Sequence, residues 1–145
     1  MLGYLDHTHP DIRFAVSQCA RFSNVPKKSH EVAVKRIGRY LLGTKTKDLI
    51  LKPSKLLKID CCVDGDFVRL WSYEDIQDPA CVKSRTEYMI CVADFPVIWK
   101  SMLQTENALS TMEAEYVALS MAMRELNPLK YGVLEVAFGI GLKLQ

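Results

Sequence analysis

The chain has 145 residues, enough for one domain and too few for two of ordinary size. Hydrophobic residues make up 49% and charged residues 25%, which is typical of soluble globular proteins and argues against a disordered or fibrous class. The net charge is only +2, but the charges are unevenly distributed. Residues 27–58 contain ten basic and two acidic residues, a local net charge of +8. Residues 60–94 contain eight acidic and three basic residues, a local net charge of −5. This division suits a protein that contacts a phosphate backbone and binds cations elsewhere, although an unevenly charged solvated surface explains it equally well.

The five cysteines have no metal-ligand spacing, because no C-x-x-C pair occurs and no histidine follows a cysteine pair. An odd number of cysteines without a secretory signal predicts reduced thiols and an intracellular protein, cytoplasmic or nuclear and not secreted. No apolar run approaches the roughly 18 residues that span a bilayer, so we expect no membrane partner.

Two amphipathic helices are predicted in the first part of the chain. The first begins at Pro10, continues with apolar residues at three- and four-residue spacing, and ends at Asn24 and Pro26. The second begins with Ser29 as its N-cap and ends at Gly43. Because the connection is short, we expect an antiparallel helix pair.

Strands follow the helices. Alternation of apolar and polar residues is clearest from Leu57 to Asp64, and Ala93-Asp94 fits a tight turn between two β-rich segments. Residues 71–82 indicate a loop. The predicted strands are residues 49–52, 57–64, 88–92 and 95–99.

The clearest predicted element is a helix that begins at Ser110. Ser110 and Glu113 have the spacing of a capping box, in which each side chain accepts a hydrogen bond from the other end of the first turn. Asn127-Pro128 stops or kinks this helix, and residues 131–138 could form one more short helix. The order of helices, strands and helices predicts an α/β (α+β) domain behind a helical lead-in.

Acidic residues at two places could carry chemistry. A pair of divalent metal ions that activates water needs several converging carboxylates, and Mg²⁺ prefers such hard oxygen ligands. Asp64 and Asp66 share one face of the predicted strand, and Glu115 lies at the start of the predicted helix. Two alternatives stay open: Asp64-Gly65 is also a strong hairpin-turn signal, and Glu113 already has a structural role in the capping box.

Three basic residues lie close together on the second predicted helix. Lys35, Arg36 and Arg39 are spaced so that their side chains point outward from one part of its surface. They could contact phosphates of a nucleic acid, or they could form an ordinary solvated face.

The chain also contains five blocks that resemble copia-type retrotransposon Pol polyproteins, in family order and at family spacing. Two resemble the end of the reverse transcriptase region: residues 9–16 (HPDIRFAV) and 35–44 (KRIGRYLLGT). Three resemble the ribonuclease H domain: residues 63–67 (VDGDF), 83–88 (KSRTEY) and 108–119 (ALSTMEAEYVAL).

The resemblance implies that residues 1–47 are the helical tail of the reverse transcriptase or connection region and that residues 48–145 are a partial ribonuclease H-like domain, an incomplete mixed sheet with helices. It implies Asp64 and Glu115 as catalytic residues, and Asp64, Glu115 and Asp66 as ligands of magnesium, of which the intact family site binds two ions. The family activity is hydrolysis of the RNA strand of an RNA–DNA hybrid, so the implied partners are such a hybrid or another nucleic acid, bound by Lys35, Arg36 and Arg39, and the remainder of the Pol polyprotein.

The chain departs from the family pattern at several positions. The family has a third catalytic aspartate in a later strand, and only Glu125 and Glu135 follow Glu115 here. Glu87 and Arg69 replace two family glycines. We therefore expect a fragment of a retrotransposon reverse transcriptase/ribonuclease H with an incomplete set of carboxylates and weak or absent activity. The alternative is a non-enzymatic nucleic-acid-binding or interaction module that retains the fold.

Overall fold

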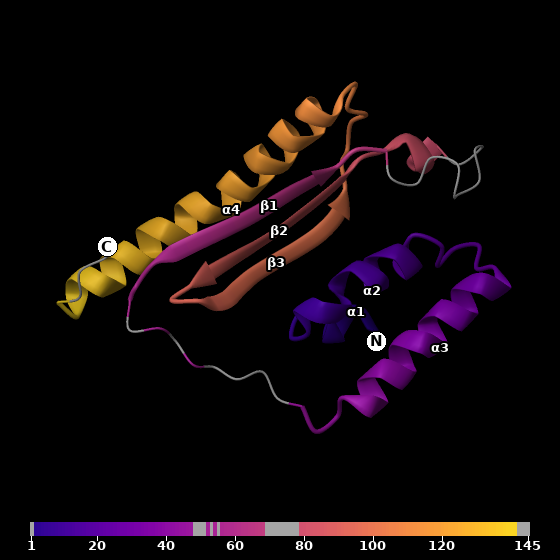
Figure 1. Cartoon of the computed structure of the whole chain (residues 1–145), viewed down its shortest axis with the longest axis horizontal. Helices are drawn as coiled ribbons and strands as arrows, with labels where there is room; N and C mark the ends of the chain where they lie inside the picture. The colour runs from indigo at the N-terminus through magenta and orange to yellow at the C-terminus, as the bar shows by residue number, and fades with distance from the viewer. Residues whose placement is uncertain (1, 48–51, 53, 55, 69–78, 142–145) are drawn as a thin grey trace. The chain divides into compact units, whose positions relative to one another are not determined.

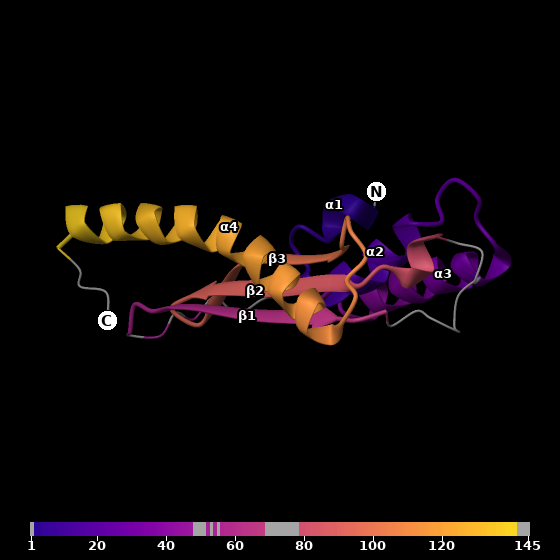
Figure 2. The ribbon, with the colours of Figure 1, turned by 90° about the horizontal axis from the view of Figure 1, so that it is seen from above.

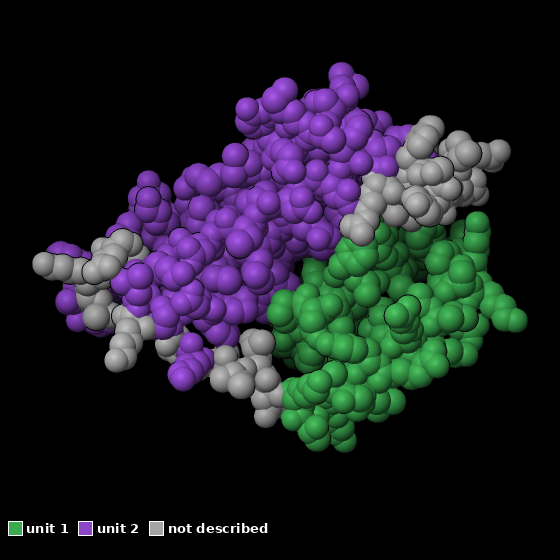
Figure 3. Space-filling model, in the orientation of Figure 1, with its two compact units in different colours: residues 1–51 green, residues 52–145 purple. Residues whose placement is uncertain are grey.

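The computed structural model describes residues 2–47, 52, 54, 56–68 and 79–141. The chain divides into two compact units, residues 1–51 and residues 52–145, which are coloured separately in Figure 3. The sequence places the boundary between residues 47 and 48. The predicted strand at residues 49–52 lies outside the described residues except for Lys52, which has no regular secondary structure.

The first unit is helical throughout the residues that form its described elements (Figure 1). Its elements are α1 (Leu2–Leu5), η1 (Pro10–Ile12), α2 (Arg13–Ala20) and α3 (Lys28–Gly43). Ile12, Val16 and Ile37 are its buried apolar residues, and Leu41 packs against them. The prediction that Tyr40 also faces inward is wrong, because Tyr40 is exposed. The Tyr40 hydroxyl donates a hydrogen bond to Asp11 and so links α3 to η1.

The start of α3 differs from the prediction. Its N-cap is Lys27, not Ser29, and the backbone N–H of Lys27 donates to Nδ1 of His30 at 3.0 Å. A histidine three residues into the helix thus provides the acceptor that a glutamate usually provides. The four-residue helix α1 was not predicted at all.

The second unit is a sheet with one long helix. The strands β1 (Ile59–Asp66), β2 (Arg85–Val92) and β3 (Phe95–Leu103) are antiparallel in the order β1-β2-β3. Ala93 and Asp94, with φ of 51° and 66°, form the predicted tight turn between β2 and β3, because a two-residue hairpin turn of this kind needs both residues in the left-handed region. The short 3-10 helix η2 (Pro79–Val82) precedes β2. The mixed α/β class is confirmed.

The helix α4 (Thr111–Gly139) runs back along β1 and covers one face of the sheet (Figures 1 and 2). Ala114, Ala118 and Ala122 are fully buried at four-residue spacing, so small side chains let the helix approach the sheet closely. Ala122 packs against Tyr88 and Ile90 in the core of this unit.

Pro128 lies inside α4, so of the two predicted alternatives, a stop or a kink, the stop is wrong. Residues 131–138 belong to the same helix and do not form a further short one. Among the described residues, no helix is both long and apolar enough to cross a membrane.

Candidate functional site

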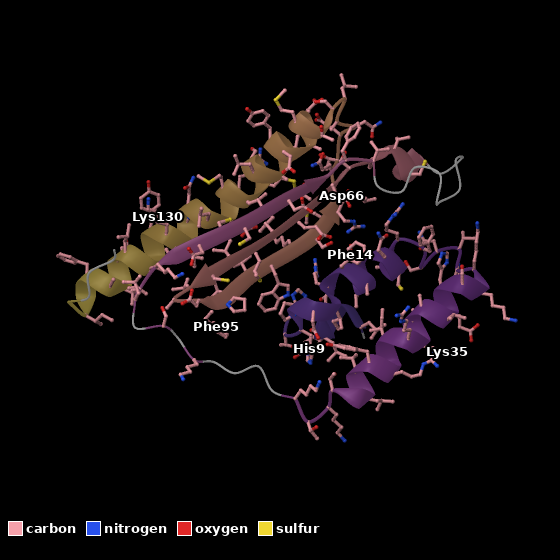
Figure 4. The ribbon with its side chains drawn as sticks, viewed as in Figure 1. His9, Phe14, Lys35, Asp66, Phe95 and Lys130 are labelled. Atoms are coloured by element: carbon pink, nitrogen blue, oxygen red, sulfur yellow. The ribbon has the colours of Figure 1, made fainter. Side chains whose placement is uncertain are left out.

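Asp64 and Gly65 lie in a strand and not in a turn. Strand β1 is paired with β2 through Asp66, with Asp64 opposite Glu87 and Gly65 opposite Thr86. The hairpin-turn alternative is therefore wrong. Ile59, Cys61 and Val63 of β1 pack in the core on the α4 side, so strand alternation puts Asp64 and Asp66 on the opposite face. Asp64 is exposed and Asp66 is half-buried, at the end of β1 (Figure 4).

Glu115 reaches β1 from the first turns of α4. Its Oε2 accepts a hydrogen bond of 3.1 Å from the backbone N–H of Gly65, although the two residues lie 50 positions apart in the chain. In antiparallel strands, the N–H groups of successive residues point alternately toward and away from the neighbouring strand. The Gly65 N–H, which Glu115 occupies, therefore points to the edge of β1 that faces away from β2.

The two carboxylates thus occupy neighbouring but different positions. Asp64 projects from the face of the sheet away from α4, and the Glu115 carboxylate lies at the edge of the same strand, one residue along. They do not share one face of the sheet. A cation held by both would have to lie at the edge of β1, where among the described residues no further strand is paired.

Gly65 is what allows this approach. A Cβ at position 65 would lie 2.7 Å from the carbonyl oxygen of Ala114 and 2.7 Å from the Cα and the N of Glu115. The backbone of β1 therefore touches the backbone of α4 at the residue that carries the predicted glutamate. Sequence reasoning treated Gly65 only as a turn signal and missed this role.

A buried glutamine fixes the same junction from the other side. Gln104 is 1% exposed, and its Nε2 donates to Oγ1 of Thr86 at 3.1 Å and to the carbonyl oxygen of Ala114 at 2.9 Å. It joins the end of β3 to β2 and to the first turn of α4. Sequence reasoning missed Gln104 because nothing local distinguishes it from a surface glutamine.

We expect Gln104→Ala to lower the free energy of unfolding by about 2–3 kcal/mol. The change removes two buried hydrogen bonds and leaves a cavity at the junction. Urea titration followed by circular dichroism measures the effect. Thr105→Ala, at the exposed neighbouring position, is the matched control and should change stability by less than about 0.5 kcal/mol. Equal effects of the two changes would show that Gln104 does not hold the junction.

A further carboxylate, that of Glu87, lies directly across from Asp64, and sequence reasoning noted it only as the replacement of a family glycine. Glu87 accepts a hydrogen bond of 2.8 Å from the Ser101 hydroxyl, and the Ser101 oxygen accepts one of 2.9 Å from the buried Arg85. This chain of hydrogen bonds supports a carboxylate beside the Asp64 carboxylate, where repulsion would otherwise be costly. Strand register alone would have revealed the juxtaposition.

Two other acidic residues of α4, Glu113 and Glu125, have structural roles. The N–H of Glu113 donates to the Ser110 hydroxyl at 3.1 Å, so Ser110 is confirmed as the N-cap. The Glu113 carboxylate accepts from the N–H of Leu109, one residue before the position that a capping box uses. Glu125 forms an ion pair with Lys100 of β3, and this hydrogen bond raises the pKa of Lys100. Glu125 is therefore used to attach α4 to the sheet. Burial raises the pKa of Tyr88, which lies beside this pair.

The donor set suits a hard cation but is small. Within the described ranges, no group of three or more histidine, cysteine, aspartate or glutamate side chains is arranged to hold a metal ion. Asp64 and Glu115 are oxygen donors of the kind that Mg²⁺ prefers, and they would supply part of a site. The five cysteines are free thiols, and burial raises the pKa of Cys61 and of Cys91, which keeps both thiols protonated at neutral pH.

The predicted basic residues lie in the first unit, on the exposed side of α3. Lys35, labelled in Figure 4, forms an ion pair with Glu31 one turn earlier, and Arg36 and Arg39 are exposed. Gly38 lies between them and leaves a shallow hollow beside Lys35 and Arg39.

Comparison with known proteins gives three informative relatives. The chain is 31% identical over 125 residues to the retrovirus-related Pol polyprotein from transposon RE1 of Arabidopsis thaliana. It is 37% identical over 126 residues to the Pol polyprotein from transposon TNT 1-94 of Nicotiana tabacum. These matches cover 86% and 85% of the chain but only 8% and 9% of the polyproteins. It is also 32% identical over 118 residues to the secreted RxLR effector protein 161 of Plasmopara viticola, covering 81% of the chain and 78% of that protein.

The chain belongs to the family of copia-type retrotransposon Pol polyproteins. The resemblance on which the sequence analysis relied is thereby confirmed. No family profile and no solved structure match the chain.

The chain spans less than a tenth of the Pol polyproteins that it matches, so it corresponds to one short stretch of the Pol sequence. Within that stretch, the Pol motif at residues 108–119 falls at the capped start of α4, and the motif at residues 63–67 falls at the end of β1. The two motifs that supply Asp64 and Glu115 are brought together at the Gly65–Ala114 contact.

Proposed function

We propose that residues 52–145 are part of a ribonuclease H-type nuclease domain, in which Asp64 and Glu115 contribute to a magnesium site. The observation that carries the proposal is the 3.1 Å hydrogen bond from the Gly65 N–H to the Glu115 carboxylate. This bond holds the carboxylate of Glu115 beside the residue that follows Asp64, the exposed aspartate of β1 in the Pol motif at residues 63–67.

Each residue in this proposal has a definite task. Asp64 offers its carboxylate to the cation from the strand, and Glu115 offers its free oxygen from the edge, while the Gly65 N–H holds its Oε2 in place. Asp66, at the end of the strand, would interact with the cation or its water shell. Magnesium, when bound, supplies an activated water and stabilises charge on the phosphate oxygens.

We further propose that Lys35, Arg36 and Arg39 contact the phosphate backbone of an RNA–DNA hybrid or another nucleic acid. Their side chains lie on one exposed part of α3, and contact with phosphates would release counterions and favour binding. The remainder of a Pol polyprotein would be the protein partner, and an intracellular location follows from such a substrate.

The proposed activity is weak in this chain. Two carboxylates from the described residues supply only part of the ligands that a pair of metal ions needs. Stabilisation of the attacking and leaving oxygens by two metal ions depends on the complete set of ligands.

The test is cleavage of a labelled RNA–DNA hybrid by the 145-residue chain in the presence of Mg²⁺. We expect slow cleavage that Asp64→Asn and Glu115→Gln each reduce at least about tenfold, since each removes a ligand charge. Asp60→Asn, on the same strand face, and Glu106→Gln, at an exposed loop position, are the matched controls and should retain the wild-type rate. Cleavage that survives both site changes would contradict the proposal.

Binding is tested separately. We expect Arg36→Gln combined with Arg39→Gln to weaken binding of the hybrid about tenfold at moderate salt and to reduce the slope of log affinity against log salt by about 2. Fluorescence anisotropy across a salt series measures both. Lys27→Gln combined with Lys28→Gln removes the same charge at the start of α3 and is the control. A slope that the arginine changes leave unaltered would exclude α3 as the phosphate-contacting surface.

A second candidate function is a non-enzymatic binding or interaction module. Two observations favour it: the carboxylate set is partial among the described residues, and a relative of similar length is named an effector protein and not a polyprotein. Salt-sensitive binding without magnesium-dependent cleavage, unchanged by Asp64→Asn, would identify this function.

A further inference from the structure

The first unit contains a polar cavity at the end of α3. It has a volume of about 440 Å³ and lies between the segment that leads into η1 and the C-terminal end of α3 with the turn that follows it. Its lining includes a carboxylate, an ammonium, a phenol and an imidazole, from Asp11, Lys47, Tyr40 and His9, the last of which is labelled in Figure 4. Ligand sites in proteins usually have volumes of about 300–1,000 Å³ and a small number of polar groups. The cavity therefore has the size and the polar content of a site for a small ligand or for one unit of a polymer.

One carboxylate oxygen of Asp11 is held in place, and the other remains available. The Tyr40 hydroxyl donates to Oδ2 of Asp11, and this hydrogen bond raises the pKa of Tyr40, which keeps the phenol protonated as a donor. Among the residues that the structure describes, none donates a hydrogen bond to Oδ1. Asp11 thus offers an oriented acceptor to a ligand in the cavity.

His9 adds a second acceptor to the lining. Its Nδ1 lies 3.1 Å from the carbonyl oxygen of Leu5, and since a carbonyl oxygen can only accept, Nδ1 carries the proton. The other ring nitrogen, Nε2, is then an acceptor in the neutral imidazole, and no residue of the described ranges donates to it. Two acceptors around one cavity favour a ligand that donates hydrogen bonds, such as a hydroxyl group.

The lining also includes a positive charge. Lys47 forms no ion pair within the part of the chain that the structure describes. A simple anion would be repelled by the Asp11 carboxylate and a simple cation by the Lys47 ammonium, so neither suits the cavity. A ligand with a hydroxyl donor and one anionic group satisfies both residues. A ribonucleotide unit of RNA has this combination, because it carries a 2′-hydroxyl and a phosphate.

The cavity continues the basic surface of α3. Tyr40 lies one turn after Arg36 and directly follows Arg39 in the helix, and both arginines belong to the proposed phosphate-contacting surface. One helical turn is about 5.4 Å long, and successive nucleotides of a strand are about 3.4 Å apart along the axis of a duplex. A strand whose phosphates lie beside these arginines therefore reaches the cavity within a few nucleotides.

We propose that this cavity binds one ribonucleotide of an RNA strand, with Oδ1 of Asp11 accepting a hydrogen bond from the 2′-hydroxyl and Lys47 contacting the adjacent phosphate. Tyr40 is a positioning residue, because it acts through the Asp11 carboxylate. The 2′-hydroxyl is the group that distinguishes RNA from DNA, so the first unit selects the RNA strand of a hybrid. This selection rests on the proposed contact of α3 with a nucleic acid, and it adds which strand that surface prefers.

Fluorescence anisotropy with two labelled hybrids tests the proposal. One is an ordinary RNA–DNA hybrid. In the other, every 2′-hydroxyl of the RNA strand is replaced by fluorine, which keeps the sugar geometry of RNA but donates no hydrogen bond. We expect the 145-residue chain to bind the hydroxyl form about tenfold more tightly, as is usual for one hydrogen bond to a charged acceptor. This comparison uses the unaltered chain, so it does not depend on how a substitution affects folding.

Variants assign the preference to the cavity. Asp11→Ala should reduce the ratio of the two affinities to about 1 and leave the slope of log affinity against log salt unaltered, because Asp11 contacts no phosphate. Lys47→Gln should weaken binding of both hybrids alike and reduce that slope by about 1. Tyr40→Phe, which keeps the ring but removes the donor to Asp11, should lower the ratio severalfold. Glu106→Ala removes an exposed carboxylate of the second unit and is the control, which should keep the wild-type ratio.

The outcomes separate this proposal from the one on which it rests. Circular dichroism verifies that the variants keep their helix content. Equal affinity of the wild-type chain for the two hybrids, or a preference that Asp11→Ala leaves intact, would overturn the selection of RNA. If the arginine changes of α3 still reduced the salt slope in that case, the proposed phosphate contact would stand alone. Absence of binding to either hybrid would contradict both proposals.

Discussion

Gly65→Ala is expected to lower the free energy of unfolding of the sheet–helix unit by about 3 kcal/mol or more. The added methyl group would lie 2.7 Å from three backbone atoms of Ala114 and Glu115. Backbone atoms cannot swing aside as the end of a flexible side chain can, so β1 and α4 must separate or bend. Separation also breaks the hydrogen bond between Gly65 and Glu115 and weakens the contact that Gln104 makes with Ala114.

Urea titration measures the loss, and a second glycine provides the control. Gly132 lies within α4 and has no atom within 4 Å of the position that a Cβ would take. Gly132→Ala should therefore raise stability by up to about 1 kcal/mol, as expected for alanine in place of glycine in a helix. Opposite signs for the same chemical change would identify the backbone contact as the cause, whereas a neutral Gly65→Ala would show that β1 and α4 do not touch there.

The elements that the sequence predicted well are those with strong local signals. The Ser110–Glu113 capping box marked the start of α4, the alternation around Cys61 marked β1, and Ala93-Asp94 marked the hairpin. In each case the residues that carry the signal also make the contact that creates the structure, within a few positions of one another. Such signals can be interpreted without knowledge of the rest of the fold.

The features that could not be predicted depend on partners far along the chain. Asp64-Gly65 has the local signature of a turn, and pairing with β2 and contact with Ala114 override that preference. Pro128 removes one hydrogen-bond donor from α4, yet Leu126 and Leu129, on either side of it, pack against the sheet and help the helix to continue.

The candidate site shows the same division. The motifs predicted Asp64 and Glu115 as the candidate carboxylates, because both belong to recognisable blocks, and that role stays a prediction. They did not predict that Glu115 would reach the edge of β1 while Asp64 projects from a face, or that Glu87 would lie across from Asp64. Those relations follow from strand register and from the height of the helix above the sheet. That height is set by the alanines of α4.

Ala118→Leu is therefore expected to cost about 3 kcal/mol, at the upper end of the usual range for overpacking. Ala118 is fully buried at the middle of the row of alanines that faces the sheet. A leucine there adds three carbon atoms to the interior, where side chains are close-packed. The helix would have to rise from the sheet along much of its length, which would expose Ile90 and Tyr88 and draw Glu115 away from Gly65.

Thermal and urea unfolding, monitored at a low micromolar concentration, measure the loss. Arg124→Leu adds a leucine at an exposed position of the same helix, and since arginine and leucine have similar helix propensities it should change stability by less than about 0.5 kcal/mol. Ala118→Gly, which adds no volume, should cost about 2 kcal/mol, from helix propensity and the loss of one buried methyl group. If leucine at position 118 proved as mild as glycine, the alanines could not be what sets the distance between α4 and the sheet, and the position of Glu115 would need another cause.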